Sequence, residues 1–179
     1  MFLMNLGLQV TLIVVGAMLG LWIALLIVNL IFVGSFSTIF KRHKKALPVI
    51  LITKHDNLKN VINILNQSGV DLDNRYIALL NDINENDFVE PGSAQFEKSK
   101  NTLSYLKDEL FFIADQHPEL NGDSEFKEAK QNIIESDTLY RNTVMMYNAD
   151  VLGYNYWIRF LPCRFIFKLF RVKKKQIIS

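Results

Sequence analysis

The first 40 residues contain no Asp, Glu, Lys or Arg, and residues 8–33 are almost entirely aliphatic, aromatic or glycine. A helix of about 20 residues crosses a hydrocarbon core of about 30 Å, so this segment is long enough to span a bilayer with some tilt. A cleaved secretory signal normally begins with basic residues and has an apolar core of about 7–15 residues. Because the segment has neither feature, the pattern favours a retained transmembrane helix.

Helical periodicity continues beyond the anchor. The first run places leucines seven residues apart, at Leu51, Leu58 and Leu65. Gly69 follows as the expected left-handed residue after the helix end. A shorter helix is predicted next, with Asp71 or Asp73 as its N-cap. Its apolar face consists of Tyr76, Leu79, Leu80 and Ile83.

Two further helices follow a polar stretch. Residues 84–94 include Pro91-Gly92, so they are predicted to form a surface loop. The second run starts after Ser93, a suitable N-cap, and its apolar positions are Phe96, Leu103, Leu106, Leu110 and Ile113. A third helix is predicted from Asp123 to Ile158, where acidic residues favour its N-terminus. Its main apolar positions lie at steps of seven, at Phe126, Ile133, Tyr140, Tyr147 and Tyr154.

Three helical runs joined by short connections predict an antiparallel helical bundle, and no alternating strand pattern competes with them. We therefore predict a mostly α fold with one N-terminal transmembrane helix. The anchor covers residues 1–40, the bundle residues 41–158 and a basic aromatic tail residues 159–179. The tyrosines of the third helix either lie in the bundle core with their hydroxyls at its edge, or form a binding surface.

Charge along the chain predicts an orientation. Four basic side chains follow the anchor directly, at Lys41, Arg42, Lys44 and Lys45. By the positive-inside rule, the N-terminus then lies outside and the rest of the chain in the cytoplasm, as in a single-pass protein of the cell (inner) membrane. Residues 46–158 carry all 18 acidic side chains and only nine basic ones. This acidic central segment argues against nucleic acid as a partner.

The C-terminal tail has a different pattern, in which aromatic and aliphatic residues interleave with basic ones from Tyr154 to Lys175. An amphipathic helix of this kind lies in a membrane interface, where its cations meet anionic headgroups. The alternative is that the tail packs back onto the bundle. Within the anchor, Gly16 and Gly20 have a spacing that lets two helices pack closely, which leaves a homo-oligomer open.

Several of these segments resemble a known family. A turn that starts at His117 leads into the third helix, which carries the pairs Tyr147-Asn148 and Tyr154-Asn155 before Pro162. These features resemble the LemA family of bacterial membrane proteins, in which a Tyr-Pro-Asp-Leu-like turn precedes a helix with paired Tyr-Asn steps and a tail containing Phe-Pro. The resemblance covers about residues 113–172, with a weaker similarity over residues 54–62. It implies an N-terminal span followed by an antiparallel helical bundle, and it implies no particular activity.

Three positions depart from the family pattern. Lys59 stands where the family has proline, Leu161 where it has phenylalanine, and Arg164 where it usually has asparagine. None of these residues interrupts the helical periodicity. The resemblance therefore bears on the fold more than on the function.

Residue types that carry catalysis or bind metals do not form a motif. His43, His55 and His117 are scattered, and the phosphate-binding, dinucleotide-binding and serine-nucleophile motifs are absent. Cys163 is the single cysteine, so no intrachain disulfide forms. Its two interpretations are a small apolar residue and an acylated one. We expect no enzyme activity, no cofactor and no metal.

The expected function is therefore that of a LemA-like single-span protein whose cytoplasmic helical module binds a protein partner. A regulatory subunit of a membrane enzyme complex and a membrane-organising protein are the alternatives. The expected partners are a bilayer with anionic headgroups and a further protein. The candidate contact residues are Lys41, Arg42, Lys44, Lys45, Tyr147, Asn148, Tyr154, Asn155, Arg164, Lys168 and Arg171.

Overall fold

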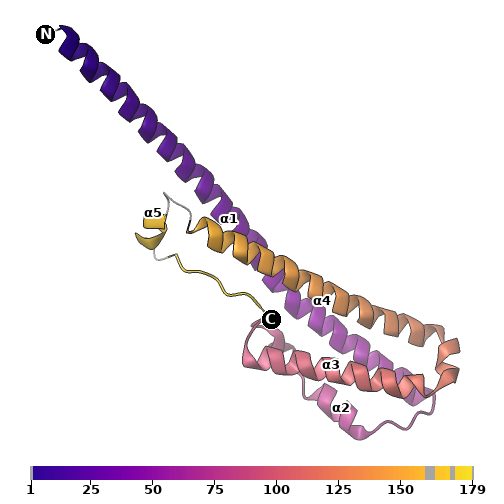
Figure 1. The fold of residues 1–179 in the computed structure, drawn as a ribbon. Helices are drawn as coiled ribbons and strands as arrows, with labels where there is room; N and C mark the ends of the chain where they lie inside the picture. The colour runs from indigo at the N-terminus through magenta and orange to yellow at the C-terminus, as the bar shows by residue number, and fades with distance from the viewer. Residues whose placement is uncertain (1, 160–163, 170–171, 179) are drawn as a thin grey trace. The chain divides into compact units, whose positions relative to one another are not determined.

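The computed structural model of the chain describes residues 2–159, 164–169 and 172–178 (Figure 1). In chain order the elements are α1 (Phe2–Gln67), α2 (Asn74–Asn81), the 3₁₀ helix η1 (Glu85–Phe88), α3 (Ala94–Asp115), the 3₁₀ helix η2 (Pro118–Gly122), α4 (Ser124–Trp157) and α5 (Arg164–Leu169). These described residues contain no strand, so the prediction of a mostly α fold is confirmed.

Contacts divide the chain into two compact units. The first unit contains Met1–Phe40 and Ala149–Ile177, and the second contains Lys41–Asn148 and Ile178–Ser179. Both α1 and α4 contribute residues to each unit. The tail of the sequence therefore belongs largely to the unit that contains the predicted anchor.

Helix α1 joins the predicted anchor and the first leucine run in one uninterrupted helix, with Pro48 inside it. Its end confirms the predicted role of Gly69, which has a φ of 77°. The Val70 N–H donates to the Leu65 carbonyl and the Gly69 N–H to the Asn66 carbonyl, both at 3.1 Å. This pair of bonds is a Schellman cap, and it satisfies carbonyls that the helix end leaves without partners.

In the second unit, side-chain caps define the starts of the next helices. The Asp73 carboxylate accepts a hydrogen bond of 2.8 Å from the Arg75 N–H, so Asp73 caps α2. The Ser93 hydroxyl accepts one of 3.1 Å from the Phe96 N–H and caps α3, as predicted. At α4, Asp123 takes this role and accepts from the N–H of Glu125 at 2.7 Å. The observed helix differs from the predicted one by a single residue at each end.

The prediction of a plain surface loop over residues 84–94 is wrong in one respect. This segment contains η1, and the Phe88 side chain there is only 1% exposed. The Phe88 ring packs edge-on against Phe96, with 6.2 Å between the ring centroids. Burial of one aromatic ring outweighs the polar character of its neighbours, because an aromatic side chain removes a large apolar area from water.

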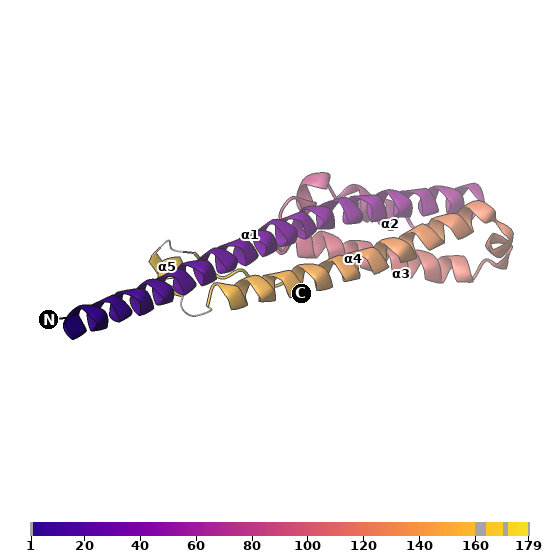
Figure 2. The same cartoon turned by 90° about the horizontal axis from the view of Figure 1, so that it is seen from above.

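The core of the second unit is built from buried side chains of α1, α3 and α4. Within this unit the three helices run side by side in both ribbon views (Figures 1 and 2). Leucines and other apolar residues at the predicted seven-residue steps are buried there. They include Leu51, Leu58 and Leu65 on α1, Phe96, Leu103 and Leu110 on α3, and Phe126 and Ile133 on α4. The Lys130 ammonium lies 3.1 Å from the Asp115 carboxylate, which links α4 to α3 at the surface.

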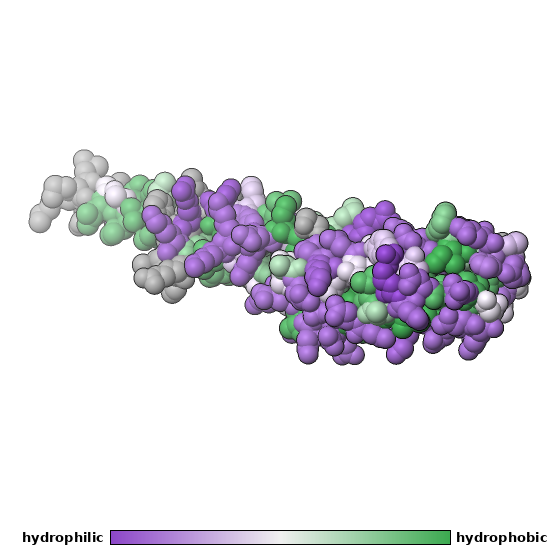
Figure 3. Space-filling view, turned by 90° about the horizontal axis from the view of Figure 1, so that it is seen from below, coloured by the Kyte–Doolittle hydropathy of each residue, from purple (hydrophilic) through white to green (hydrophobic). Residues whose placement is uncertain are grey.

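In the first unit, the N-terminal part of α1 carries large apolar side chains that are exposed from Leu8 to Phe32. The space-filling view shows this as green surface toward the N-terminal end, whereas purple residues cover much of the second unit (Figure 3). Among the described residues, α1 is the helix that is long and apolar enough to cross a membrane. This property is compatible with a membrane-anchored protein.

The rest of α1 in this unit packs against the end of α4. The Phe32 and Trp157 rings stack with 4.6 Å between centroids, and the Asn29 amide donates to the Trp157 carbonyl at 3.2 Å. Gly153 lies against the Phe36 ring so closely that a Cβ there would be 2.7 Å from the ring. The absence of a side chain at this position therefore sets how near the two helices approach.

The Schellman cap of α1 generates a prediction. Replacing Gly69 by Ala should destabilise the folded chain by about 1 kcal/mol, because an L side chain is strained at positive φ. Gly122→Ala is the matched control: neither glycine has atoms within 4 Å of a new Cβ, and only Gly69 has a positive φ. The control should leave stability unchanged or raise it by up to about 1 kcal/mol, because alanine restricts the unfolded chain without straining the folded one. Denaturant unfolding of both variants in detergent micelles, followed by circular dichroism, measures the difference; equal effects would contradict it.

Candidate functional site

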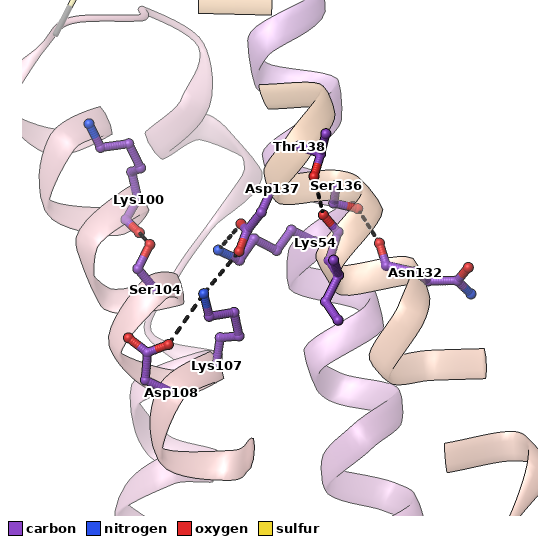
Figure 4. A network of polar contacts seen from close by, with 10 residues as sticks. Lys54, Lys100, Ser104, Lys107, Asp108, Asn132, Ser136, Asp137 and Thr138 are labelled. Atoms are coloured by element: carbon purple, nitrogen blue, oxygen red, sulfur yellow. Dashed lines mark hydrogen bonds and ion pairs between the residues drawn. The ribbon is translucent and has the colours of Figure 1, made fainter. Parts of the chain in front are cut away.

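A buried lysine is the central polar feature of the second unit. Lys54 lies on α1 and is only 3% exposed. Its ammonium donates a 2.5 Å hydrogen bond to the Asp137 carboxylate on α4. The other oxygen of Asp137 accepts from Lys107 on α3 at 3.0 Å (Figure 4). One carboxylate therefore connects three helices.

The electrostatics of this triad favour charged partners. Burial opposes ionisation of Asp137, but hydrogen bonds and charges from Lys54 and then Lys107 outweigh it and lower the pKa of Asp137. For Lys107, burial acts in the opposite direction to its bonds with Asp137 and Asp108, and these bonds raise its pKa. Both shifts stabilise the ion pairs in the folded state. The triad thus fixes the positions of the three helices relative to one another along their axes.

A cleft opens beside the triad, with a volume of about 360 Å³. We call it the charged cleft, and its lining residues are Leu51, Lys54, Lys100, Ser104, Asp137, Tyr140, Arg141, Val144 and Met145. The Tyr140 hydroxyl is buried and has no hydrogen-bond partner within the described chain. Burial, followed by the charge of Glu97, raises the pKa of Tyr140 to about 12, so the hydroxyl stays protonated at neutral pH. It can therefore donate a hydrogen bond, but it supplies no phenolate nucleophile.

The two asparagines of the Tyr-Asn pairs hold the C-terminal segment. Asn148 donates from Nδ2 to the Ile178 carbonyl at 2.8 Å and accepts from the Ile178 N–H at 2.9 Å. Asn155 does the same with Lys175, with both bonds at 2.9 Å. We call these two arrangements the asparagine clamps. In each clamp one side-chain amide pairs with both backbone groups of a single residue.

The first unit also contains a basic cleft of about 550 Å³. Its lining residues are Ile158, Arg159, Arg164, Phe167, Lys168, Val172 and Lys174. The four basic side chains are exposed, whereas Ile158 and Phe167 are buried. Cations around an apolar floor suit a ligand that combines negative charge with hydrocarbon.

The candidate contact residues predicted from the sequence lie in different environments in the structure. The basic cluster lies on α1, where Lys41, Arg42 and Lys45 are exposed and Lys44 is partly buried. This exposure fits a solvated cluster. Tyr147 and Tyr154 are 5% and 6% exposed, so they are core residues instead of a binding surface. Burial raises the pKa of both tyrosines.

The composition of the tail predicts one amphipathic helix, and this prediction is wrong. Its described parts are the short helix α5 and an extended segment from Val172 to Ile178. The clamps bind backbone groups of this segment, which a helix would have used internally. Arg164 and Lys168 line the basic cleft, while Arg171, Leu161, Pro162 and Cys163 lie outside the described residues.

Apolar spacing alone does not reveal Lys54 and Asp137, although the sequence contains a signal for them. Lys54 lies three residues after Leu51 and four before Leu58, on the face that those leucines bury. Asp137 lies seven residues before Val144, which belongs to the apolar face of α4. Opposite charges at apolar positions of two helices are the pattern expected for a buried ion pair.

Removal of Asp137 tests the triad. Asp137→Asn should destabilise the folded chain by about 3 kcal/mol, because the buried Lys54 ammonium loses its counter-charge. Asp108→Asn is the matched control: its carboxylate lies 3.2 Å from Lys107 but is 72% exposed, so its loss should cost less than about 0.5 kcal/mol. Denaturant unfolding at neutral pH measures both effects. A small effect for Asp137→Asn would show that the pair contributes little.

The same two proteins give a prediction for pH. Because the pKa of Asp137 is lowered in the folded state, its stabilising effect is present above the unfolded-state pKa of about 3.9. The effect is lost as the pH falls below that value through the folded-state pKa. The stability difference between the wild-type chain and Asp137→Asn should therefore be constant from neutral pH to about pH 5 and shrink below about pH 4.

Comparison with known proteins places these features in a family. No curated protein and no solved structure matches the chain. The model of the LemA family matches residues 52–179, which include the asparagine clamps, the charged triad and the basic cleft. This match covers well over half of the sequence and confirms the resemblance to the family, so the chain belongs to the LemA family.

Proposed function

We propose that this LemA-family chain is a single-pass protein of the cell membrane that presents a helical interaction module in the cytoplasm. The continuity of α1 is the observation that carries the proposal. One helix contains the exposed apolar residues from Leu8 to Phe32 and the buried leucines from Leu51 onward, with the basic cluster at residues 41–45 between them. A single helix therefore carries both a segment suited to hydrocarbon and a segment that belongs to the folded core of the second unit.

The proposed orientation has the N-terminus outside. Lys41, Arg42, Lys44 and Lys45 support it, because basic residues that flank a span remain on the cytoplasmic side. The proposed module is an antiparallel bundle. In the second unit, α3 residues 107 and 115 pair with α4 residues 137 and 130, so the numbers rise along one helix as they fall along the other.

The proposed partners are an anionic bilayer and a second protein. The basic cleft supports the first, because Arg159, Arg164, Lys168 and Lys174 surround its apolar floor. The acidic balance of residues 46–158 favours a protein partner over nucleic acid. We propose no intrinsic catalysis and no cofactor: the triad engages its charges in holding helices together. Self-association through Gly16 and Gly20 stays a prediction.

Reporter fusions test the orientation. An enzyme that is active only after export, fused after Ser179, should be inactive, whereas a reporter that folds in the cytoplasm should be active. Replacing Lys41, Arg42, Lys44 and Lys45 by Gln should weaken this preference and produce a mixed orientation. Activity of the export-dependent reporter on the unaltered chain would overturn the assignment.

Lysine labelling tests lipid contact by the basic cleft. In the full chain reconstituted into bilayer discs, anionic lipid should slow acetylation of Lys168 and Lys174 about fivefold, which corresponds to about 1 kcal/mol for each cation near an anionic surface. High salt should remove the protection, since it screens exposed charges. Lys98 and Lys127, exposed on the second unit, are the internal controls. Equal rates in anionic and zwitterionic discs would exclude the contact.

A further inference from the structure

The charged cleft contains a buried polar atom that the described chain leaves without a partner. Tyr140 lies partly buried on α4, and its buried hydroxyl has no hydrogen-bond partner within the described chain. Buried hydroxyls are nearly always bonded, because an unbonded one gives up its bonds to water and gains none in return. The pKa of Tyr140 is raised to about 12, so the hydroxyl is protonated at neutral pH and can donate. It therefore suits an acceptor that enters the cleft from outside the chain.

The Lys54 ammonium is a second buried donor beside this hydroxyl. Lys54 is 3% exposed, and its ammonium has three N–H groups, one of which donates to Asp137 (Figure 4). Among the described residues, Asp137 is its one hydrogen-bond acceptor. Asp137 and Tyr140 are three residues apart on α4, so they are neighbours on one face of the helix. The lysine that is bonded to Asp137 therefore brings further donors to the same part of the cleft.

The charge of the cleft favours a ligand with one negative charge. Three cations line it, at Lys54, Lys100 and Arg141, together with the carboxylate of Asp137. The Glu97 carboxylate forms an ion pair with Lys100, and its charge acts on the tyrosine hydroxyl, so it is counted with the cleft. Three cations and two carboxylates leave one positive charge in excess. A monoanion balances this charge, whereas a cation would add to it.

The rest of the lining is apolar, which favours an organic anion over an inorganic one. Leu51 is 2% exposed and Met145 is 64% exposed, so the apolar wall extends from the interior to the surface, with the partly buried Val144 as a further member. The volume of about 360 Å³ lies at the lower end of the range for small-molecule sites, which is about 300–1,000 Å³. An apolar body can cover this wall while an anionic group reaches the donors.

We propose that the charged cleft is a binding site for a small organic monocarboxylate. The carboxylate accepts hydrogen bonds from the Tyr140 hydroxyl and the Lys54 ammonium, and the exposed Arg141 guanidinium attracts it. Its hydrocarbon body lies against the apolar wall. All of the lining residues belong to the second unit, so the site is independent of the anchor and of the basic cleft. The inference goes beyond the proposed interaction module, and its failure would leave the orientation and the bilayer contact unaffected.

Fluorine NMR on the full chain in zwitterionic bilayer discs tests the site with two probes of different length, para-fluorobenzoate and para-fluorohydrocinnamate. The longer probe should bind saturably with a Kd of about 1 mM or tighter, as expected for a ligand of about a dozen heavy atoms. Its neutral primary amide keeps the apolar body and loses the charge, so it should bind about tenfold more weakly. Empty discs correct for partition of the probes into lipid.

Three results of this experiment would overturn the proposal. The first is no saturable binding of either probe. The second is equal binding of the acid and its amide, which would mean that the cleft does not recognise the carboxylate. The third is displacement of the longer probe by an equal concentration of inorganic phosphate, which would mean that the cleft holds anions without regard to an apolar body.

Tyr140→Phe removes the hydroxyl and keeps the ring. The variant should bind the longer probe about tenfold more weakly, as expected for loss of a hydrogen bond to a charged group. It should be at least as stable as the wild-type chain, because no bonded polar group is removed, so weaker binding would not result from unfolding. Tyr105→Phe is the matched control: Tyr105 is 41% exposed and accepts a hydrogen bond from Arg75, so its loss should leave binding unchanged. Unchanged binding by Tyr140→Phe would overturn the proposal.

Arg141→Gln tests the charge at the cleft. Arg141 is exposed, so the substitution should leave the fold intact and weaken binding of the longer probe about threefold. It should also reduce the dependence of binding on salt, since one screened charge is removed. Lys127→Gln is the matched control, because Lys127 is an exposed cation of the same helix that does not line the cleft. Equal weakening by the two substitutions would show that the net charge of the chain attracts the probe, and it would overturn a specific site in the cleft.

Discussion

The seven-residue spacing along α4 determines both what this helix buries and what it holds. Ile133, Tyr147 and Tyr154 belong to the repeat and are buried. Each of the two tyrosines is followed directly by an asparagine, so the same repeat places Asn148 and Asn155 at equivalent positions one residue around the helix. Packing of the tyrosines fixes the rotation of α4, and this rotation in turn presents the asparagines to the C-terminal segment.

The charged triad is a different kind of constraint, because it is directional. Helices that pack through leucines can shift slightly along their axes without losing these contacts. Lys54 and Lys107, in contrast, must both reach the one carboxylate of Asp137. The cost of an unpaired buried ammonium makes alternative registers of α1 and α4 unfavourable. Such a pair contributes to specificity of packing as well as to stability. It lies beside the Tyr140 hydroxyl, a further polar group of the charged cleft.

Features set by local chemistry were predictable from the sequence, and features set by distant contacts were not. Gly69, Ser93 and the limits of α4 follow from capping and periodicity, which act over a few residues. The clamps join residues 20 and 30 positions apart, and no local pattern in the lysine run announces its pairing with Asn155. The burial of Phe88 was missed for the same reason: its contact with Phe96 lies beyond the proline-glycine turn. Lys54 and Asp137 are predictable from the sequence by a different signal, which is charge at apolar positions of two helices.

The distance between Lys54 and Asp137 along the chain affects biosynthesis. They are 83 residues apart, so at about 5–20 residues per second the ribosome needs roughly 4–17 s to make Asp137 after Lys54. During that interval α1 can already be helical, since helices form in about a microsecond. Its lysine then has no counter-charge, and desolvation would be costly, so the leucine face around it stays open to water. Packing of the core around Lys54 must therefore wait until α4 has been synthesised. The apolar N-terminal part of α1 contains no buried charge of this kind, so it does not have to wait for α4.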